Sequence, residues 1–522
     1  RSQKWPPTMQ PSAEITPLIG RRLRLDGLQV LDATLDLPVA ADEPFELPRW
    51  PESLPAIELP LSLESDVIEI DGLRVTRASA PVIDIARVRG GLDARDGWLR
   101  VTELVVHSDR GVFRVHGDYA PRDNYRMDLS AGALLPAPLG RTRPRIGLAA
   151  RGDLASLDVA LSGRGPTQGR AHLRVRGADM PTWTLTAASD AFDPSLLSGS
   201  GEAGVPLAFS LRADGQGGAM RAQGRVERDG AVYVLQPSAL RIEDQVLEVE
   251  RLVLDAFEGR IVAQGRGDFS QPDDASFKFA INARDLAFTG SEDGDQPGAP
   301  PPAIGVDAYF GIAGRTAAWA AIGKATLSRD GQQALLDFDG RGDGERMTLQ
   351  RAHVAMPTGT LDATGGVAWS PALQWDIDAV LAGFDPGYFA PDWRGAVNGR
   401  FTTTGNTRDD EGLDIAVDAT DLGGTLRGRR LDGRANVSIR TPARGNTRTD
   451  YAGDIALTLG GSRIDAKGRM ADVLDVDARF TPLDLADLLP NAGGTLRGRL
   501  QLAGARTAPD VDVDLDGSGL RW

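Results

Sequence analysis

Apolar and polar residues alternate along much of the chain with a period of two, the pattern of strands that bury one face. Leu23 and Leu25 alternate with arginines, and Val511, Val513 and Leu515 alternate with aspartates. Asp-Gly or Asn-Gly pairs, typical of two-residue hairpin turns, separate such stretches. We therefore expect about 40 strands, roughly one per 11 to 13 residues, mostly antiparallel to their neighbours in sequence. The turn pairs begin at Asp26, Asp71, Asp96, Asp214, Asp229, Asp330, Asp343, Asn398, Asp432 and Asp516.

Helix-forming segments are few and short, and the best of them is 482–489, where four leucines follow a proline. A sheet of many strands without covering helices must hide its apolar side by curling along its length. The pattern thus predicts an all-β protein with very little helix: a long, repetitive, mostly antiparallel curled sheet that forms an elongated, taco-like hydrophobic groove. An array of packed β-sandwiches is the alternative.

One frame of residues occurs three times at identical spacing, starting at Leu99, Leu247 and Met347. Apolar residues stand at offsets 0, 2, 5 and 7, glycine at 12, apolar residues at 14 and 16, and glycine at 18. The change of parity between offsets 2 and 5 predicts a β-bulge, and the two glycines bracket a return strand. Core packing would explain any one of these apolar residues equally well, so the prediction is that they face the groove together. The candidate lipid-lining residues are Val101, Leu104, Val106, Phe113, Val115, Val249, Leu252, Leu254, Ile261, Leu349, Val354 and Leu361.

A second frame begins at Phe384 and at Leu483, each followed by Asp, with glycines at offsets 11, 15 and 21. A looser copy opens at Phe192. The copies of both frames are irregularly spaced, which excludes a short-period solenoid and favours one motif elaborated along a growing sheet.

The chain divides by composition into four segments of one continuous architecture. We expect Pro-rich initial strands and loops over 1–60, the first part of the groove over 61–289, an acidic Gly/Pro-rich loop over 290–303, and the second part of the groove over 304–522.

Composition and charge exclude several functions. The net charge is −15, with both signs interleaved along the chain, which argues against a nucleic-acid partner. There is no cysteine, so disulfides and thiolate chemistry are excluded. No stretch approaches 18 apolar residues, and the chain begins with Arg1 and shows no signal pattern. We expect a fragment of a longer protein whose anchor lies outside it.

No catalytic, cofactor or metal site is predicted. The aspartates of 512–516 with Gly517 match the start of an EF-hand loop, but its twelfth position would be residue 523, and the wet face of a strand explains them better. The Gly-x-Gly-x-x-Gly match at 199–204 opens a probable strand instead of a helix. The four histidines form no i, i+4 pair, and no Gly-x-Ser-x-Gly occurs. We expect no enzymatic activity.

Four stretches resemble the AsmA-like family of bacterial envelope proteins, and within it the TamB group. They are 60–75, the frame 99–117, the glycine-rich string 423–433, and 483–504. The resemblance implies a bridge-like lipid transfer protein of the Gram-negative periplasm that carries phospholipid acyl chains along its groove and supports outer-membrane assembly. It also implies an inner-membrane anchor before this region, and an outer-membrane TamA-like (Omp85-type) partner that binds a C-terminal region after it.

Two other functions fit the same pattern. An exposed sheet edge would template strands of outer-membrane β-barrel proteins by strand augmentation, with no lipid conduit. A surface adhesin or passive spacer would also need a long sheet but no apolar path.

Overall fold

The computed structural model describes residues 22–37, 46–47, 49–51, 54–59, 62–78, 80–137, 140–178, 180–198, 204–288, 304–408, 412–442, 448–488 and 492–521. The chain divides into two compact units, unit 1 (Arg1–Pro272) and unit 2 (Asp273–Trp522). The predicted segment 290–303 lies outside the described residues, and the four-segment division of the chain stays a prediction.

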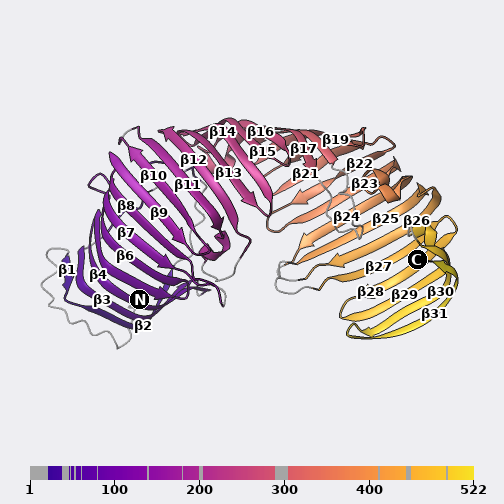
Figure 1. Ribbon diagram of the computed structural model, residues 1–522, viewed down its shortest axis with the longest axis horizontal. Helices are drawn as coiled ribbons and strands as arrows, with labels where there is room; N and C mark the ends of the chain where they lie inside the picture. Colours follow the sequence, from indigo (N-terminus) through magenta and orange to yellow (C-terminus); the bar gives the residue numbers. More distant parts are fainter. Residues whose placement is uncertain are drawn as a thin grey trace. The chain divides into compact units, whose positions relative to one another are not determined.

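The described residues of unit 1 form sixteen strands, β1 to β16. Their course along the chain can be followed in Figure 1. They are β1 (Arg22–Leu25), β2 (Leu28–Leu37), β3 (Ser62–Arg77), β4 (Ala80–Arg95), β5 (Trp98–Ser108), β6 (Gly111–Ala120), β7 (Arg126–Leu134), β8 (Arg145–Asp153), β9 (Ser156–Arg164), β10 (Gly169–Arg176), β11 (Thr182–Phe192), β12 (Leu207–Gln216), β13 (Ala219–Arg228), β14 (Ala231–Glu243), β15 (Val246–Ala256) and β16 (Gly259–Asp268).

The part of unit 2 that the structure describes forms fifteen strands. They are β17 (Ser276–Phe288), β18 (Ile304–Arg315), β19 (Ala318–Arg329), β20 (Gln332–Gly342), β21 (Arg346–Ala355), β22 (Thr360–Ala368), β23 (Gln374–Phe384), β24 (Gly395–Thr407), β25 (Leu413–Leu426), β26 (Arg429–Arg440), β27 (Asp450–Leu459), β28 (Ser462–Met470), β29 (Val473–Asp484), β30 (Gly493–Ala505) and β31 (Ala508–Arg521).

The prediction of a long, mostly antiparallel curled sheet is confirmed. The described strands belong to a 31-stranded sheet, and within each unit successive strands from β3 onwards pair antiparallel. The exception is at the start, where β1 and β2 both pair parallel to β3. A parallel pair needs a crossover, and residues 38–61 supply it.

The strand count is lower than predicted because most Asp-Gly and Asn-Gly pairs are not turns. Only those at Asp96, Asp229 and Asp330 form two-residue hairpin turns between antiparallel strands, and the pair at Asp343 lies in a three-residue turn. The pair at Asp26 separates β1 from β2. The pairs at Asp71, Asp214, Asn398, Asp432 and Asp516 lie inside strands, which therefore run longer than the turn chemistry suggested.

The predicted β-bulge is confirmed in all three copies of the first frame. The register shifts between Val101 and Leu104, between Val249 and Leu252, and between Leu349 and Ala352. At the first bulge Glu103 adopts a positive φ of 44°. The bulge returns the apolar residues on its two sides to one face of the sheet, although their sequence spacing is odd.

Among the described residues, helix is confined to short segments: η2 (Pro194–Ser198), η3 (Pro272–Asp274), η4 (Pro386–Tyr388), η5 (Pro391–Trp393) and α1 (Leu485–Leu488). The helix predicted over 482–489 is shorter, because β29 extends through Asp484 and Leu489 lies outside the described residues. Each copy of the second frame connects two antiparallel strands through such a helical segment. None of the described helices is long and apolar enough to cross a membrane.

Candidate functional site

The two faces of the sheet differ sharply in chemistry. Directly paired residues of neighbouring strands point to the same face, so the registers of successive pairs link into rows that cross the strands. In unit 1 one such row crosses β5 to β16 without a polar side chain, and we call it the central row of unit 1. Its members are Leu104, Val115, Ala131, Leu148, Leu161, Ala171, Ala187, Leu211, Gly224, Leu235, Leu254 and Ile261.

Unit 2 has a matching central row that crosses all fifteen of its strands, again without a polar side chain. Its members are Ile281, Phe310, Gly323, Phe338, Ala352, Ala363, Ala379, Phe401, Ala419, Ala435, Ile455, Ala466, Ala478, Leu500 and Val513.

A second apolar row runs along one edge of the same face in each unit. We call this edge the rim: it holds the turns β4–β5 through β14–β15 in unit 1 and β18–β19 through β30–β31 in unit 2. The rim row of unit 1 is Leu99, Tyr119, Met127, Gly152, Leu157, Val175, Trp183, Gly215, Met220, Leu240, Val249 and Gly265. The rim row of unit 2 is Phe277, Gly314, Trp319, Gly342, Met347, Val367, Trp375, Gly405, Ile415, Ile439, Tyr451, Met470, Leu474, Gly504 and Pro509.

Glycines in the rim rows make room for tryptophan rings. Trp375 is paired with Gly405, and its indole lies where a Cβ on that glycine would stand. Trp319 and Gly342, and Trp183 and Gly215, repeat the arrangement. Each ring therefore lies flat across the neighbouring strand, which keeps the row continuously apolar where a side chain is missing.

The opposite face is polar and carries ion pairs between neighbouring strands. Arg176 contacts Asp158 at 2.7 Å in unit 1, and Arg440 contacts Asp414 at 2.9 Å in unit 2. The hydrogen bond from Arg176 lowers the pKa of Asp158, and the hydrogen bond from Arg440 lowers the pKa of Asp414. In unit 2 the residues next in sequence to the central row form a row on the polar face, and over nine strands all of them are polar. They are Asp378, Thr402, Asp418, Asn436, Asp454, Lys467, Asp477, Gln501 and Asp512.

All twelve predicted groove residues lie on the apolar face. Leu104, Val115, Leu254 and Ile261 belong to the central row, and Val249 belongs to the rim row. The remainder occupy rows on either side of the central row. Val101, Leu252 and Leu349 lie on the side nearer the rim, and Val106, Phe113, Val354 and Leu361 lie on the other side. That these residues contact lipid stays a prediction.

The apolar face is only partly buried. No member of the central row of unit 1 is buried: eleven are half-buried, and Leu161 is 40% exposed. In unit 2 only Gly323, Ala419 and Ala478 of fifteen are buried. A packed sandwich would bury these residues against a second layer, so the central rows form an accessible surface and not a closed core.

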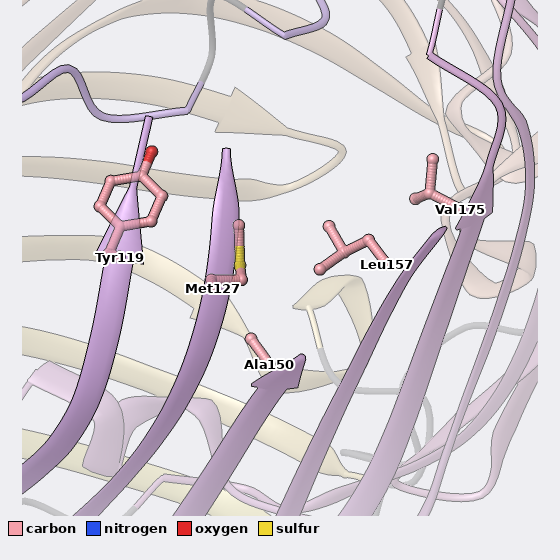
Figure 2. Packing of buried hydrophobic residues seen from close by; sticks show 5 residues of the cluster. All are labelled: Tyr119, Met127, Ala150, Leu157 and Val175. Atoms are coloured by element: carbon pink, nitrogen blue, oxygen red, sulfur yellow. The ribbon is translucent and has the colours of Figure 1, made fainter. Parts of the chain in front are cut away.

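A short segment covers the rim row of unit 1. Its described residues are 46–47, 49–51 and 54–59, which we call the strap. Trp50 and Ile57 of the strap pack against a cluster of five residues from β6 to β10 near the rim: Tyr119, Met127, Ala150, Leu157 and Val175, all at most 7% exposed. Figure 2 shows these five side chains in a row across neighbouring strands.

Hydrogen bonds hold the strap at both ends. The Gln245 side chain, in the β14–β15 turn, accepts from the Leu47 amide at 2.7 Å and donates to the Leu47 carbonyl at 3.0 Å. Towards the other end the Tyr119 hydroxyl donates to the Pro55 carbonyl at 2.6 Å, and the Gly97 amide donates to the Ile57 carbonyl at 2.7 Å. The strap therefore reaches from the β4–β5 turn to the β14–β15 turn.

The length of the strap shows that the apolar face of unit 1 is on the inside of a bend. Ten strand spacings separate the two turns, about 48 Å along a flat sheet. Ten residues from Leu47 to Ile57 can span at most about 36 Å. The Gln245 side chain is too short to make up the difference. The rim must therefore curve towards the strap, which lies on the apolar face.

The edge opposite the rim, which we call the cap edge, carries the helical connections of the second frame. In unit 2 the buried Arg329 side chain, at the end of β19, donates to the carbonyls of Tyr388 and Phe389 at 2.7 and 2.9 Å. Asp487 of α1 is 2% exposed, accepts from the Ser462 hydroxyl at 2.7 Å and pairs with Arg429 at 3.0 Å. The helical segments of the second frame are therefore bound to the ends of strands up to four strands away.

No group of three or more His, Asp or Glu side chains among the described residues is arranged to hold a metal ion.

The sequence did not predict the strap, because the Pro-rich start was interpreted only as strands and loops. A local signal was absent, because its partners lie up to 198 residues away.

Comparison with known proteins finds that part of the chain is similar to one family. Residues 320–522 match the family described as "TamB, N-terminal domain". The chain is also 24% identical over 180 residues to "Translocation and assembly module subunit TamB" of Haemophilus influenzae, an alignment that spans 33% of this chain and 13% of that protein. No solved structure matches the chain significantly.

Proposed function

We propose, for a chain that belongs to the TamB family, that the apolar face is a groove along which phospholipid acyl chains move between the membranes of the Gram-negative envelope. The chain would then lie in the periplasm and support outer-membrane assembly. The whole protein would be anchored in the inner membrane and would bind an outer-membrane TamA-like partner. The observation that carries the proposal is the unbroken, partly exposed central row in each unit.

The dimensions of the face suit this cargo. The rim row, the central row, the row between them and the row beyond the central row together make an apolar band about 20 Å wide. One leaflet of a bilayer core is about 15 Å thick. The central rows extend about 53 Å in unit 1 and about 67 Å in unit 2, measured along the sheet. An acyl chain can therefore lie along the strands while it moves from strand to strand.

The energetics of transfer require a continuous apolar surface. Exposing a 16-carbon chain to water costs on the order of 12 kcal/mol, at about 0.8 kcal/mol per CH₂. A single charged residue in the row would remove the apolar contacts that offset this cost, and the acyl chain would stop there. The central rows contain no such interruption over twelve and fifteen strands.

Photo-crosslinking in cells tests the proposal. Crosslinkers at Val106, Leu254 and Val354 should trap phospholipid. Crosslinkers at the neighbouring residues Val105, Asp255 and Ala355, which point to the polar face, should not. Protein adducts alone at the first three positions would contradict the conduit and favour a scaffold for strand augmentation. The β2 strand, which pairs on one side only among the described residues, suits such a scaffold.

A further inference from the structure

We propose that the strap is a displaceable cover: it occupies the rim row of unit 1 in place of an acyl chain, and it leaves when an acyl chain arrives. The inference rests on the proposed function, since it concerns access to the same apolar face. The starting observation is that equivalent rows are treated differently in the two units. Tyr119, Met127, Leu157 and Val175 are buried beneath the strap, whereas Gly405 alone is buried in the rim row of unit 2.

The strap contributes to the face what a lipid would contribute. Its contacts with the rim cluster are made by Trp50 and Ile57, and Leu47 is itself buried at the Gln245 end. Apolar groups without charge thus cover an apolar row that is otherwise open to the groove. Hydrocarbon chains that lie along these strands and extend to the rim would bury the same side chains.

The strap is held in a way that permits release. Its described residues belong to no strand, and polar contacts from Gln245, Tyr119 and Gly97 fix its backbone. Each such hydrogen bond contributes only about 1 kcal/mol net. An interior strand of the sheet, by contrast, has a ladder of bonds on each side. Segments with few hydrogen bonds open locally at low free energy while the rest of the fold stays intact.

Trp50 adds a specific reason for release. Its indole Nε1 is buried and finds no hydrogen-bond acceptor in the described part of the chain. Leaving a donor buried and unpaired destabilises the covered state, and displacement of the strap into water would satisfy it. Since β2 and β3 bound the crossover, a displaced strap stays tethered and can return.

Fluorescence quenching tests this directly. The chain has no cysteine, so Met127→Cys provides a single site for a bimane label beneath the strap. Trp50 should quench the label, and the same label in a Trp50→Phe chain measures the quenching by other tryptophans such as Trp183. Leu129→Cys, half-buried against the same cluster, serves if the first variant does not fold.

Titration with a 16-carbon lysophospholipid, kept below its critical micelle concentration, should remove the Trp50-dependent quenching. Gln245→Ala removes both hydrogen bonds to Leu47 and should lower the lipid concentration at half-effect about 30-fold. Gln236→Ala, on the polar face of β14, is the matched control and should leave the midpoint unchanged.

The outcomes separate the two proposals. If lipid crosslinks at Leu254 and Val354 while Trp50-dependent quenching stays constant, the strap is a fixed brace and this inference is wrong, although the conduit stands. If lipid crosslinks nowhere on the apolar face, the proposed function fails first. If the labelled chain that keeps Trp50 shows no Trp50-dependent quenching in the absence of lipid, the strap does not cover the rim and the inference is again wrong.

Discussion

Unit 1 and unit 2 carry the same apolar rows, yet one unit covers its rim and the other leaves it open. Leu157 in the rim row of unit 1 is 2% exposed, whereas Tyr451 and Met470 in the rim row of unit 2 are 42% and 38% exposed. The rows themselves do not account for this, because both are made of aliphatic and aromatic residues interrupted by glycine. The difference arises from a crossover that only the parallel β2–β3 pair requires. A connection imposed by topology thus becomes a cover for an apolar surface.

The largest expected effect comes from a charge placed beneath the strap. Ala150 is 6% exposed in the covered cluster, so Ala150→Asp should cost about 3 kcal/mol of local stability, because the carboxylate finds neither water nor a partner. Hydrogen exchange of β7 to β9 measures this. Ala149→Asp places the same group on the polar face one residue away and should change stability by less than about 0.5 kcal/mol. Ala435→Asp, in the open central row of unit 2, should fall between the two, and an equal loss there would break the comparison.

Truncation of the rim rows should give the next largest effect. Leu157→Ala leaves a cavity beneath the strap and should cost about 3 kcal/mol. Ile439→Ala, half-buried in the rim row of unit 2, removes less buried surface and should cost about 1 kcal/mol. Local hydrogen exchange in each unit provides both values. Equal losses at the two positions would mean that the strap adds no packing.

The smallest effect concerns the polar face, which is uncovered in both units. The lowered pKa values of Asp158 and Asp414 mean that each carboxylate stabilises the fold above the ordinary aspartate pKa of about 3.9, and that this stability is lost as the pH falls through the lower folded pKa. Melting temperatures between pH 7 and pH 3 should therefore fall slightly more for the wild type than for Asp158→Asn or Asp414→Asn. The exposed pairs are screened by salt, so both differences should shrink at high ionic strength. A large effect in one unit alone would mean that the two units differ on the polar face as well.

The sequence predicted the alternating strands, their antiparallel order and the bulge between Val101 and Leu104, because all of these follow from local spacing. It placed turns wrongly at pairs such as Asp214-Gly215. The role of that glycine is decided by Trp183, thirty-two residues earlier, whose ring lies over it. Turn chemistry is a property of two residues, whereas a glycine inside a sheet depends on the neighbouring strand.

The candidate site was predictable in part. Its apolar rows follow from the same alternation, and all twelve proposed lining residues fall on one face. The covering of the rim did not follow, since Leu47 and Gln245 are 198 residues apart and neither belongs to a recognisable motif. Whether a repeated surface is open or covered depends on such long-range contacts, which periodicity does not encode.

The bond between Leu47 and Gln245 also sets an order of assembly. The described strands after β3 within each unit pair with their immediate successors, so hairpins can add one after another as the chain becomes available. The contact at Leu47 has no partner until the β14–β15 turn has formed. The Leu47 end of the strap must therefore wait unpaired while some two hundred later residues fold, although its Ile57 end can bind Gly97 once the β4–β5 turn has formed.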